Sequence, residues 1–182
     1  MIRFSSNANT EYLLDRLSVD SVNAAIKRLG LSKQQPLYPF VASLFIGQGL
    51  TIDQIKAMSD EKYIAASAAI HNKLKTDTAF KRSFKPVTLD MQRVWSDRLP
   101  GGTTREYTAI LKKINRRDFF SAAEQKVIDE MMEGILDNPQ NREWLTHAGF
   151  KGGSTAFVFT MAMYANSKKG TRTELAYFFN DL

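Results

Sequence analysis

Two short segments, far apart in the sequence, carry the residues best suited to chemistry. Residues 5–7 read Ser-Ser-Asn just ahead of an expected helix, and residues 151–155 read Lys-Gly-Gly-Ser-Thr. A serine hydroxyl can relay a proton, and a lysine at the entrance of a strand supplies a fixed cation. Glycine beside that lysine lets another backbone approach closely. Together these residue types suit an anionic substrate that lies against a strand edge.

The second segment opens a region that favours β-strands. Residues 156–164 and 173–179 are rich in apolar and β-favouring side chains, and a Ser-Lys-Lys-Gly break separates them at 167–170. Strong β formers on both sides of a glycine-containing turn indicate an antiparallel hairpin. We therefore predict antiparallel strands over residues 147–182, with Lys151 at the entrance of the hairpin.

The preceding region, residues 7–146, is expected to be mainly helical because helix-capping residues recur along it. The expected N-cap residues are Asp20, Thr51, Ser59, Thr103 and Ser121. Gly30 is expected to end the helix that Asp20 begins, and the helix that Ser121 begins is expected to reach Leu136. Helices followed by antiparallel strands predict an α+β fold. A length of 182 residues without a clear linker predicts one domain over 1–182.

The two segments resemble signatures of the penicillin-recognising serine hydrolases, which include class A β-lactamases and penicillin-binding proteins. That family has three signatures in order, S-x-x-K, S-x-N and K-T-G or a K-x-G variant. Residues 5–7 look like the second signature and residues 151–153 like the third. The contexts at 2–14, 103–114 and 119–136 are also similar, so the resemblance covers roughly 1–31 and 95–182. It implies a β-lactamase/transpeptidase-like fold that is incomplete in this chain.

The resemblance also implies a role for each residue of the two segments. Ser5 would relay a proton to the leaving nitrogen, and Lys151 would support Ser5 and attract the substrate carboxylate. The substrate-binding residues implied by the resemblance are Asn7, Gly153, Ser154 and Thr155. Among these, Asn7 would hold the substrate's amide side chain, and the backbone N–H of Ser154 would form half of an oxyanion hole. The hydroxyl of Ser154 or Thr155 would bind the carboxylate. The implied substrates are β-lactams or cell-wall (peptidoglycan) peptides.

The first signature, which supplies the nucleophile, does not precede residue 5. The chain contains one S-x-x-K, at Ser59–Lys62, and there a helix cap is the favoured interpretation. The chain is therefore expected to be the C-terminal portion of a serine hydrolase whose nucleophile segment lies elsewhere, and to be inactive alone. The hairpin 155–179 should then lack partners on one face, exposing Phe157, Phe159, Tyr177 or Phe179. Dimerisation, or docking of a complementing N-terminal segment, would cover that face.

Two functions remain open at this point. The first is a serine acyl hydrolase of the β-lactamase or D-alanyl-D-alanine peptidase type. The second is a non-catalytic β-lactamase-like binding or scaffold protein. Residues 30–49 contain no Asp or Glu, whereas class A β-lactamases have an acid in the corresponding loop. Slow deacylation, as in a penicillin-binding protein, is therefore expected of the first alternative.

The composition of the chain excludes several kinds of chemistry and several kinds of partner. The chain has no cysteine, which excludes disulfides and thiol nucleophiles, and its two histidines, His71 and His147, are too far apart to indicate a metal pair by spacing. We expect no metal and no cofactor. The net charge of +6 is spread over separate clusters, which favours a solvated surface over a nucleic-acid interface. No apolar run could span a membrane. The resemblance implies a periplasmic or extracellular location.

Overall fold

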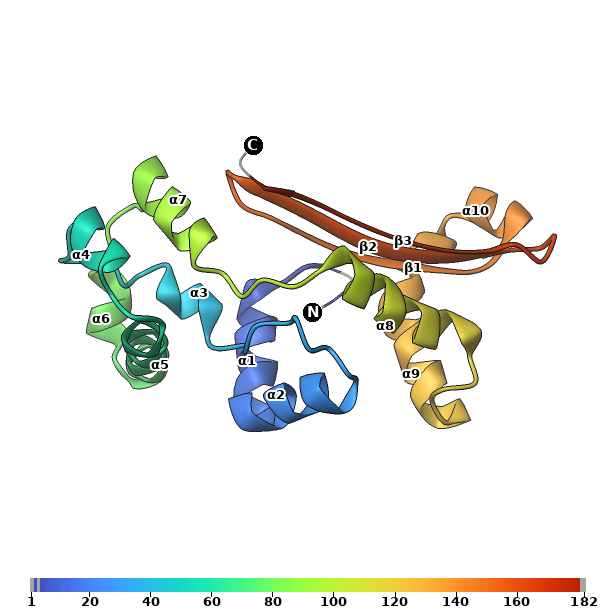
Figure 1. Cartoon of the computed structure of the whole chain (residues 1–182), viewed down its shortest axis with the longest axis horizontal. Helices are drawn as coiled ribbons and strands as arrows, with labels where there is room; N and C mark the ends of the chain where they lie inside the picture. Colours follow the sequence, from blue (N-terminus) through green and yellow to red (C-terminus); the bar gives the residue numbers. More distant parts are fainter. Residues whose placement is uncertain (1, 3, 181–182) are drawn as a thin grey trace. The chain divides into compact units, whose positions relative to one another are not determined.

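The computed structural model describes residue 2 and residues 4–180 (Figure 1). Helices come first along the chain and three antiparallel strands come last, which confirms the predicted α+β class. The chain forms two compact units. The helical unit comprises 7–101 and 155–157, and the sheet unit comprises the described residues of 1–6, 102–154 and 158–182. Among the described residues, no helix is long and apolar enough to cross a bilayer.

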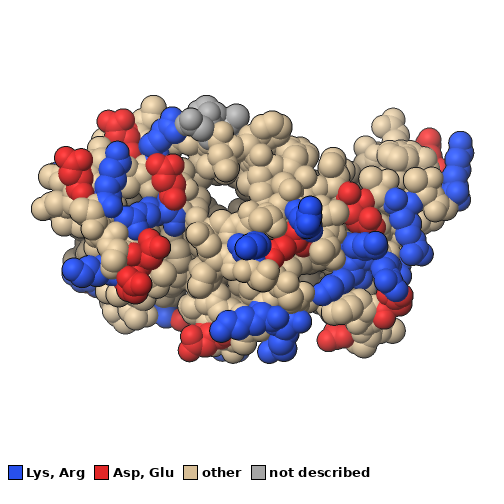
Figure 2. Space-filling view, viewed as in Figure 1, with Lys and Arg blue, Asp and Glu red and all other residues tan. Residues whose placement is uncertain are grey.

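Charged side chains of both signs lie on the surface of the protein. On the face shown in Figure 2, Lys and Arg lie among Asp and Glu. Several of the basic residues pair locally, as Arg116 does with Asp118 at 2.9 Å and Arg98 with Asp60 at 2.9 Å. Such exposed pairs neutralise part of the positive charge locally and contribute little to stability.

The helical unit contains seven α-helices among its described residues. They are α1 (Asn7–Leu17), α2 (Val19–Arg28), α3 (Phe40–Ser43), α4 (Ile52–Lys56), α5 (Asp60–Thr76), α6 (Thr78–Arg82) and α7 (Leu89–Asp97). The predicted caps at Thr51 and Ser59 are confirmed, since each hydroxyl accepts a backbone N–H from the first turn. The cap of α2 is Ser18 and not Asp20, because Ser18 Oγ accepts from the N–H of Ser21. Asp20 instead lies in the first turn, where a carboxylate favours the positive end of the helix dipole.

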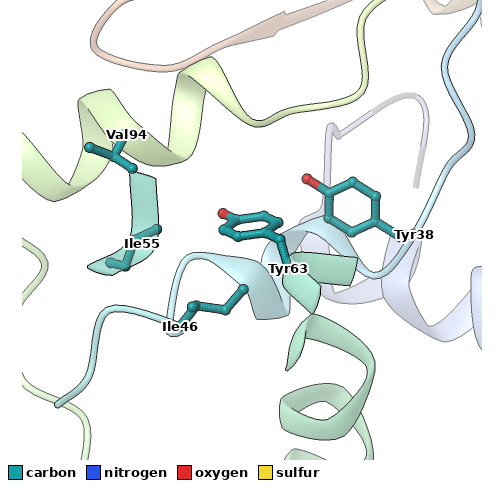
Figure 3. Close-up of a cluster of buried hydrophobic side chains, with 5 residues drawn as sticks. All are labelled: Tyr38, Ile46, Ile55, Tyr63 and Val94. Carbon is teal, nitrogen blue, oxygen red and sulfur yellow. The ribbon is translucent and has the colours of Figure 1, made fainter. Parts of the chain in front are cut away.

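The core of the helical unit lies among α3, α4, α5 and α7 (Figure 3). Its buried side chains are Tyr38, Ile46, Ile55, Tyr63 and Val94. Tyr38 and Tyr63 meet edge to face with ring centroids 6.2 Å apart. Burial raises the pKa of Tyr38 to about 12, and its hydroxyl donates to the backbone oxygen of Arg98 at 2.6 Å. The phenol is therefore a neutral donor that ties the end of α7 to this core.

The sheet unit begins with helices and ends with the sheet. Its elements are α8 (Thr104–Arg116), α9 (Ala122–Met132), a 3-10 helix η1 (Glu133–Asp137), α10 (Pro139–Trp144), β1 (Leu145–Ser154), β2 (Val158–Ser167) and β3 (Arg172–Asn180). The caps at Thr103 and Ser121 are confirmed. The helix that Ser121 begins ends at Met132, and η1 continues to Asp137. The strands lie in the order β1-β2-β3, both pairs antiparallel.

The predicted hairpin differs from the structure in one respect. Lys151 lies inside β1, a separate strand that pairs with β2, instead of at the start of the hairpin's first strand. Residues 155–157 form the connection between these strands, and β2 begins at Val158. The run of β-favouring residues from 156 onward concealed this turn, because neither Ala156 nor Phe157 is a typical turn residue.

One face of the sheet packs against helices. Leu111 and Ile114 of α8 form a buried cluster with Ala162 and Tyr164 of β2. Tyr107 of α8 also meets Phe178 of β3 edge to face, with ring centroids 5.3 Å apart. The amphipathic α8 thus supplies the apolar surface that covers this side of β2 and β3.

The other face of the sheet carries large apolar side chains that are partly or largely exposed. Phe150, Met163 and Leu175 are cross-strand neighbours on this face. Phe159 of β2 and Phe179 of β3 form another cross-strand pair on the same face, four residues along each strand from Met163 and Leu175. Phe150 is 41% exposed, Leu175 47% and Phe179 53%. The prediction of an exposed apolar face is therefore confirmed for Phe179, while Phe159 and Tyr177 are half-buried. Phe157 is different, because it belongs to the helical unit and lies under the guanidinium of Arg93 at 4.2 Å.

We expect this apolar face to make the chain self-associate, because soluble monomers rarely leave such a patch in water. Replacing Leu175 by Lys places a charge in the middle of the face and should weaken self-association at least about tenfold, since burying one such side chain contributes roughly 2 kcal/mol. Light scattering over a concentration series measures the effect. Thr171→Lys, at an exposed position in the turn just before β3, is the matched control. A wild-type chain that stays monomeric at every concentration would contradict the prediction.

Candidate functional site

Ser5 lies in a turn that precedes α1. Its backbone N–H donates to the carbonyl of Ile2 at 3.3 Å, and its φ angle is +48°, in the left-handed region that side chains other than glycine rarely adopt. The residue is exposed. Strain of this kind often accompanies functional positions, because the surrounding structure must impose it.

Lys151 lies on β1 and is half-buried. Ala162 and Ala176 are its cross-strand neighbours on the two following strands. Side chains alternate between the faces of a strand, so Lys151 shares the face on which Ala162 joins the core beneath α8. The two small side chains leave room for the long aliphatic stem of the lysine. Burial lowers the pKa of Lys151 below its ordinary value.

Ser5 and Lys151 meet, although 146 positions separate them in the sequence. Lys151 Nζ donates to Ser5 Oγ at 2.9 Å and also to the carbonyl oxygen of Gly152. The predicted proximity of these two residues is therefore confirmed. An ammonium that donates to the hydroxyl oxygen leaves the hydroxyl proton free to point toward another acceptor. The pair can thus hold a proton donor next to a fixed positive charge.

The residues that follow Lys151 form the open end of β1. Gly153 and Ser154 are both exposed, and they pair with Thr160 and Phe159 of β2. A methyl group added at Gly153 would meet only Thr160 Oγ1, at 3.5 Å, so the neighbouring side chains leave space there. Since β1 is an edge strand of the described sheet, an extended chain could lie alongside this part of it.

The two remaining predicted binding residues belong to the helical unit. Asn7 is the first residue of α1 and is exposed. Thr155 Oγ1 accepts a hydrogen bond from Ser96 Oγ at 2.8 Å and another from the N–H of Phe157 at 3.1 Å. Because Ser154 is exposed whereas Thr155 is half-buried, Ser154 is the better candidate of the two for binding a carboxylate.

The chain's one S-x-x-K pattern has a structural role. Ser59 is the N-cap of α5, and its hydroxyl accepts from the N–H of Lys62 at 3.4 Å. This contact confirms the expected cap.

Two groups of polar residues were not predicted as clusters. In the helical unit, Glu11 Oε1 accepts from the N–H of Val41 at 2.9 Å, and Glu11 Oε2 lies 2.8 Å from His71 Nδ1. A carboxylate from α1 thereby reaches the acid-free segment 30–49. In the sheet unit, His147 joins Glu133 and Arg117. The i, i+4 spacing of Asp129 and Glu133 was the available sequence signal, since such pairs share one side of a helix.

Comparison with protein-family models gives no match for this chain, and comparison with curated proteins gives no match either.

Proposed function

We propose that the pair Ser5–Lys151 is the proton-relay and carboxylate-binding part of a serine acyl hydrolase of the β-lactamase or D-alanyl-D-alanine peptidase type. Its substrates would be β-lactams or cell-wall peptides, met in the periplasm or outside the cell. The observation that carries the proposal is the hydrogen bond from Lys151 Nζ to Ser5 Oγ at 2.9 Å. It joins a hydroxyl to a cation across two segments that lie 146 positions apart in the sequence.

The proposed chemistry assigns one task to each residue. As the acyl C–N bond breaks, the hydroxyl proton of Ser5 passes to the leaving nitrogen, and Ser5 Oγ takes a proton in turn from the Lys151 ammonium that donates to it. The same ammonium attracts the substrate carboxylate, and the exposed end of β1 receives the substrate backbone at Gly153. The backbone N–H of Ser154 would donate to the developing oxyanion. The nucleophile would come from an S-x-x-K segment other than Ser59–Lys62.

A second candidate is a non-catalytic binding or scaffold protein that uses the same edge strand, β1. One observation favours it, namely the hydroxyl of Ser59, which caps α5 and is therefore not available as a nucleophile. The two candidates share the carboxylate contact and differ in whether an acyl bond forms. Incubation with benzylpenicillin followed by intact-mass measurement would separate them in a protein that also carries the S-x-x-K nucleophile segment, because only the hydrolase would form a covalent adduct. We expect no covalent adduct with the 182-residue chain alone.

Non-covalent binding provides the main test. Benzylpenicillin should shift the amide NMR signals of Gly152, Gly153 and Ser154, and its methyl ester, which lacks the negative charge, should bind about tenfold more weakly. Lys151→Ala should remove this preference for the acid, because a cation stabilises an anion it touches and senses a neutral ester little. Lys151→Arg keeps the charge but changes the reach, so it should recover only part of the preference.

Lys168→Ala is the matched control, because Lys168 is an exposed lysine beyond the end of β2. It should leave the preference for the acid unchanged. Equal binding of acid and ester by the wild-type chain, or shifts confined to other residues, would contradict the proposed function.

A further inference from the structure

A second group of ionisable side chains lies in the sheet unit, separate from Ser5 and Lys151. We call it the His147 cluster, and its members are Arg117, Asp129, Glu133 and His147. Asp129 lies on α9, Glu133 opens η1, and His147 lies on β1 beside an irregularity in its pairing with β2. Arg117 ends α8 with a φ of +64°, which turns the chain back toward α9. Four different elements therefore converge at this point.

Three members of the cluster offer ligand atoms that a metal ion could bind together. One oxygen of Asp129, one oxygen of Glu133 and one ring nitrogen of His147 lie within 4.8 Å of one another, and all three residues are half-buried. His147 Nδ1 is 3.1 Å from Glu133 Oε1. For an ion about 2.1 Å from both atoms, the angle Nδ1–ion–Oε1 would be roughly 95°. This angle suits a tetrahedral or five-coordinate zinc site.

In this structure a cation already occupies the space between the three groups. Arg117 Nη1 donates to Asp129 Oδ1 at 3.0 Å, lies 3.1 Å from His147 Nδ1, and lies 3.9 Å from Glu133 Oε1. Arg117 Nη2 donates to the other oxygen of Asp129 at 2.6 Å. One guanidinium nitrogen thus makes contact with every candidate ligand. The three groups therefore favour a positive charge between them. The Arg117 side chain that supplies this charge is 29% exposed, so it has solvent on one side into which it can turn.

The surroundings supply a further oxygen and a route of entry. Gln125 is only 5% exposed, its amide nitrogen donates to Asp129 Oδ1 at 2.9 Å, and its buried Oε1 has no hydrogen-bond partner. A half-turn of this amide would exchange the two atoms and place the unpartnered oxygen beside Asp129. A hollow of about 460 Å³, lined in part by Asp129, Glu133 and Thr146, opens the cluster to solvent. Tyr164 fixes Glu133 from the buried side by donating to its Oε1 at 3.2 Å.

We propose that the His147 cluster binds a divalent transition-metal ion of the zinc class, with Asp129, Glu133 and His147 as ligands. Arg117 fills the position of the ion when no metal is present and leaves it when metal binds. Mixed imidazole and carboxylate ligands favour zinc and its neighbours over calcium or magnesium, which prefer oxygen alone. The guanidinium and the ion compete for the same three groups, so removing the guanidinium should strengthen metal binding. This inference does not depend on the proposed function of Ser5 and Lys151.

The test is a calorimetric zinc titration of the 182-residue chain at neutral pH, after treatment with a chelator. We expect one zinc ion per chain. Arg117→Asn should bind zinc at least about tenfold more tightly, because it removes the competing cation and Asn tolerates the left-handed backbone at this position. His147→Ala should bind at least about tenfold more weakly through the loss of one ligand. His71→Ala, which changes the chain's only other histidine, should bind like the wild type.

The opposite signs expected for Arg117→Asn and His147→Ala make the test decisive. Zinc binding by neither the wild type nor Arg117→Asn would overturn the proposal, and so would binding that His147→Ala leaves unchanged. Circular dichroism checks that each variant is folded. If Arg117→Asn does not fold, the visible absorption of bound cobalt is measured instead for the wild type and for His147→Ala. An absorption band that the wild type gives and His147→Ala lacks supports the site. A band retained in His147→Ala overturns it.

Discussion

Replacing Arg98 by Met should lower the free energy of unfolding of the helical unit by about 2–3 kcal/mol, since carbonyl groups that lose their only charged donor each contribute on the order of 1 kcal/mol. Arg98 Nη2 donates to the backbone oxygens of Ile55, Lys56 and Met58, at 3.2, 3.0 and 2.7 Å. These carbonyls lie at and just beyond the end of α4, where a helix begins to lack internal partners for its oxygens, although that of Ile55 also accepts from the N–H of Met58 at 3.1 Å. Met fills a similar volume but donates nothing.

Urea unfolding followed by circular dichroism measures this loss, and two further variants isolate its cause. Asp60→Asn removes the ion pair with Arg98, but the Asp60 side chain is 86% exposed, so the change should cost less than about 0.5 kcal/mol. Arg98→Lys keeps the charge without the planar fork and should recover only a minor part of the loss. If Asp60→Asn proved as costly as Arg98→Met, the ion pair would be the main contribution and the carbonyl contacts secondary.

The parts of this fold that the sequence predicts well are those decided by neighbouring residues. The caps at Thr51, Ser59, Thr103 and Ser121 involve contacts three residues apart, so the sequence contains both partners. The cap at Ser18 was missed because Asp20 is an equally good capping residue two positions later. Local capping rules find the helix and leave its first residue uncertain by a few positions.

Contacts between distant segments are not predicted in this way. Arg98 reaches carbonyls some 40 positions away, and Glu11 reaches Val41 across 30 positions. No local pattern distinguishes these two side chains from other surface charges. Similarly, Trp144 has a large aromatic side chain of a type that commonly packs in cores, but it is 58% exposed at the end of α10. Side-chain type alone does not determine burial.

The two candidate sites also differ in how far the sequence predicts them. The contact between Ser5 and Lys151 was predicted from a resemblance in which these two signatures belong together, and not from any local physical rule. For the His147 cluster the sequence offers only the i, i+4 spacing of Asp129 and Glu133, because the members come from α8, α9, η1 and β1. Its assembly depends on how β1 packs against the helices, and that packing depends on the glycines of β1.

Replacing Gly149 by Ala is also expected to have a large effect on stability. A methyl group there would lie 2.7–2.8 Å from the ring atoms Cε1 and Cζ and the hydroxyl oxygen of Tyr164, a residue that is only 1% exposed. Such distances require the ring or the strand to move, and overpacking of a buried site costs about 1–3 kcal/mol. Movement of the ring would also disturb its hydrogen bond to Glu133. We therefore expect Gly149→Ala to lower the melting temperature of the sheet unit by several degrees, the usual equivalent of about 1–2 kcal/mol.

Gly153→Ala, four positions along the same strand, is the matched control for this effect. Its added methyl meets only Thr160 Oγ1 at 3.5 Å, an ordinary contact, and alanine is favoured over glycine in a strand by roughly 0.5 kcal/mol or more. We expect this variant to be as stable as the wild type or slightly more stable, yet to bind benzylpenicillin less well because the methyl obstructs the approach to β1. Thermal unfolding and NMR titration of both variants separate stability from binding. Equal stability of the two variants would contradict the packing role of Gly149, and unchanged binding by Gly153→Ala would place the ligand away from this end of the strand.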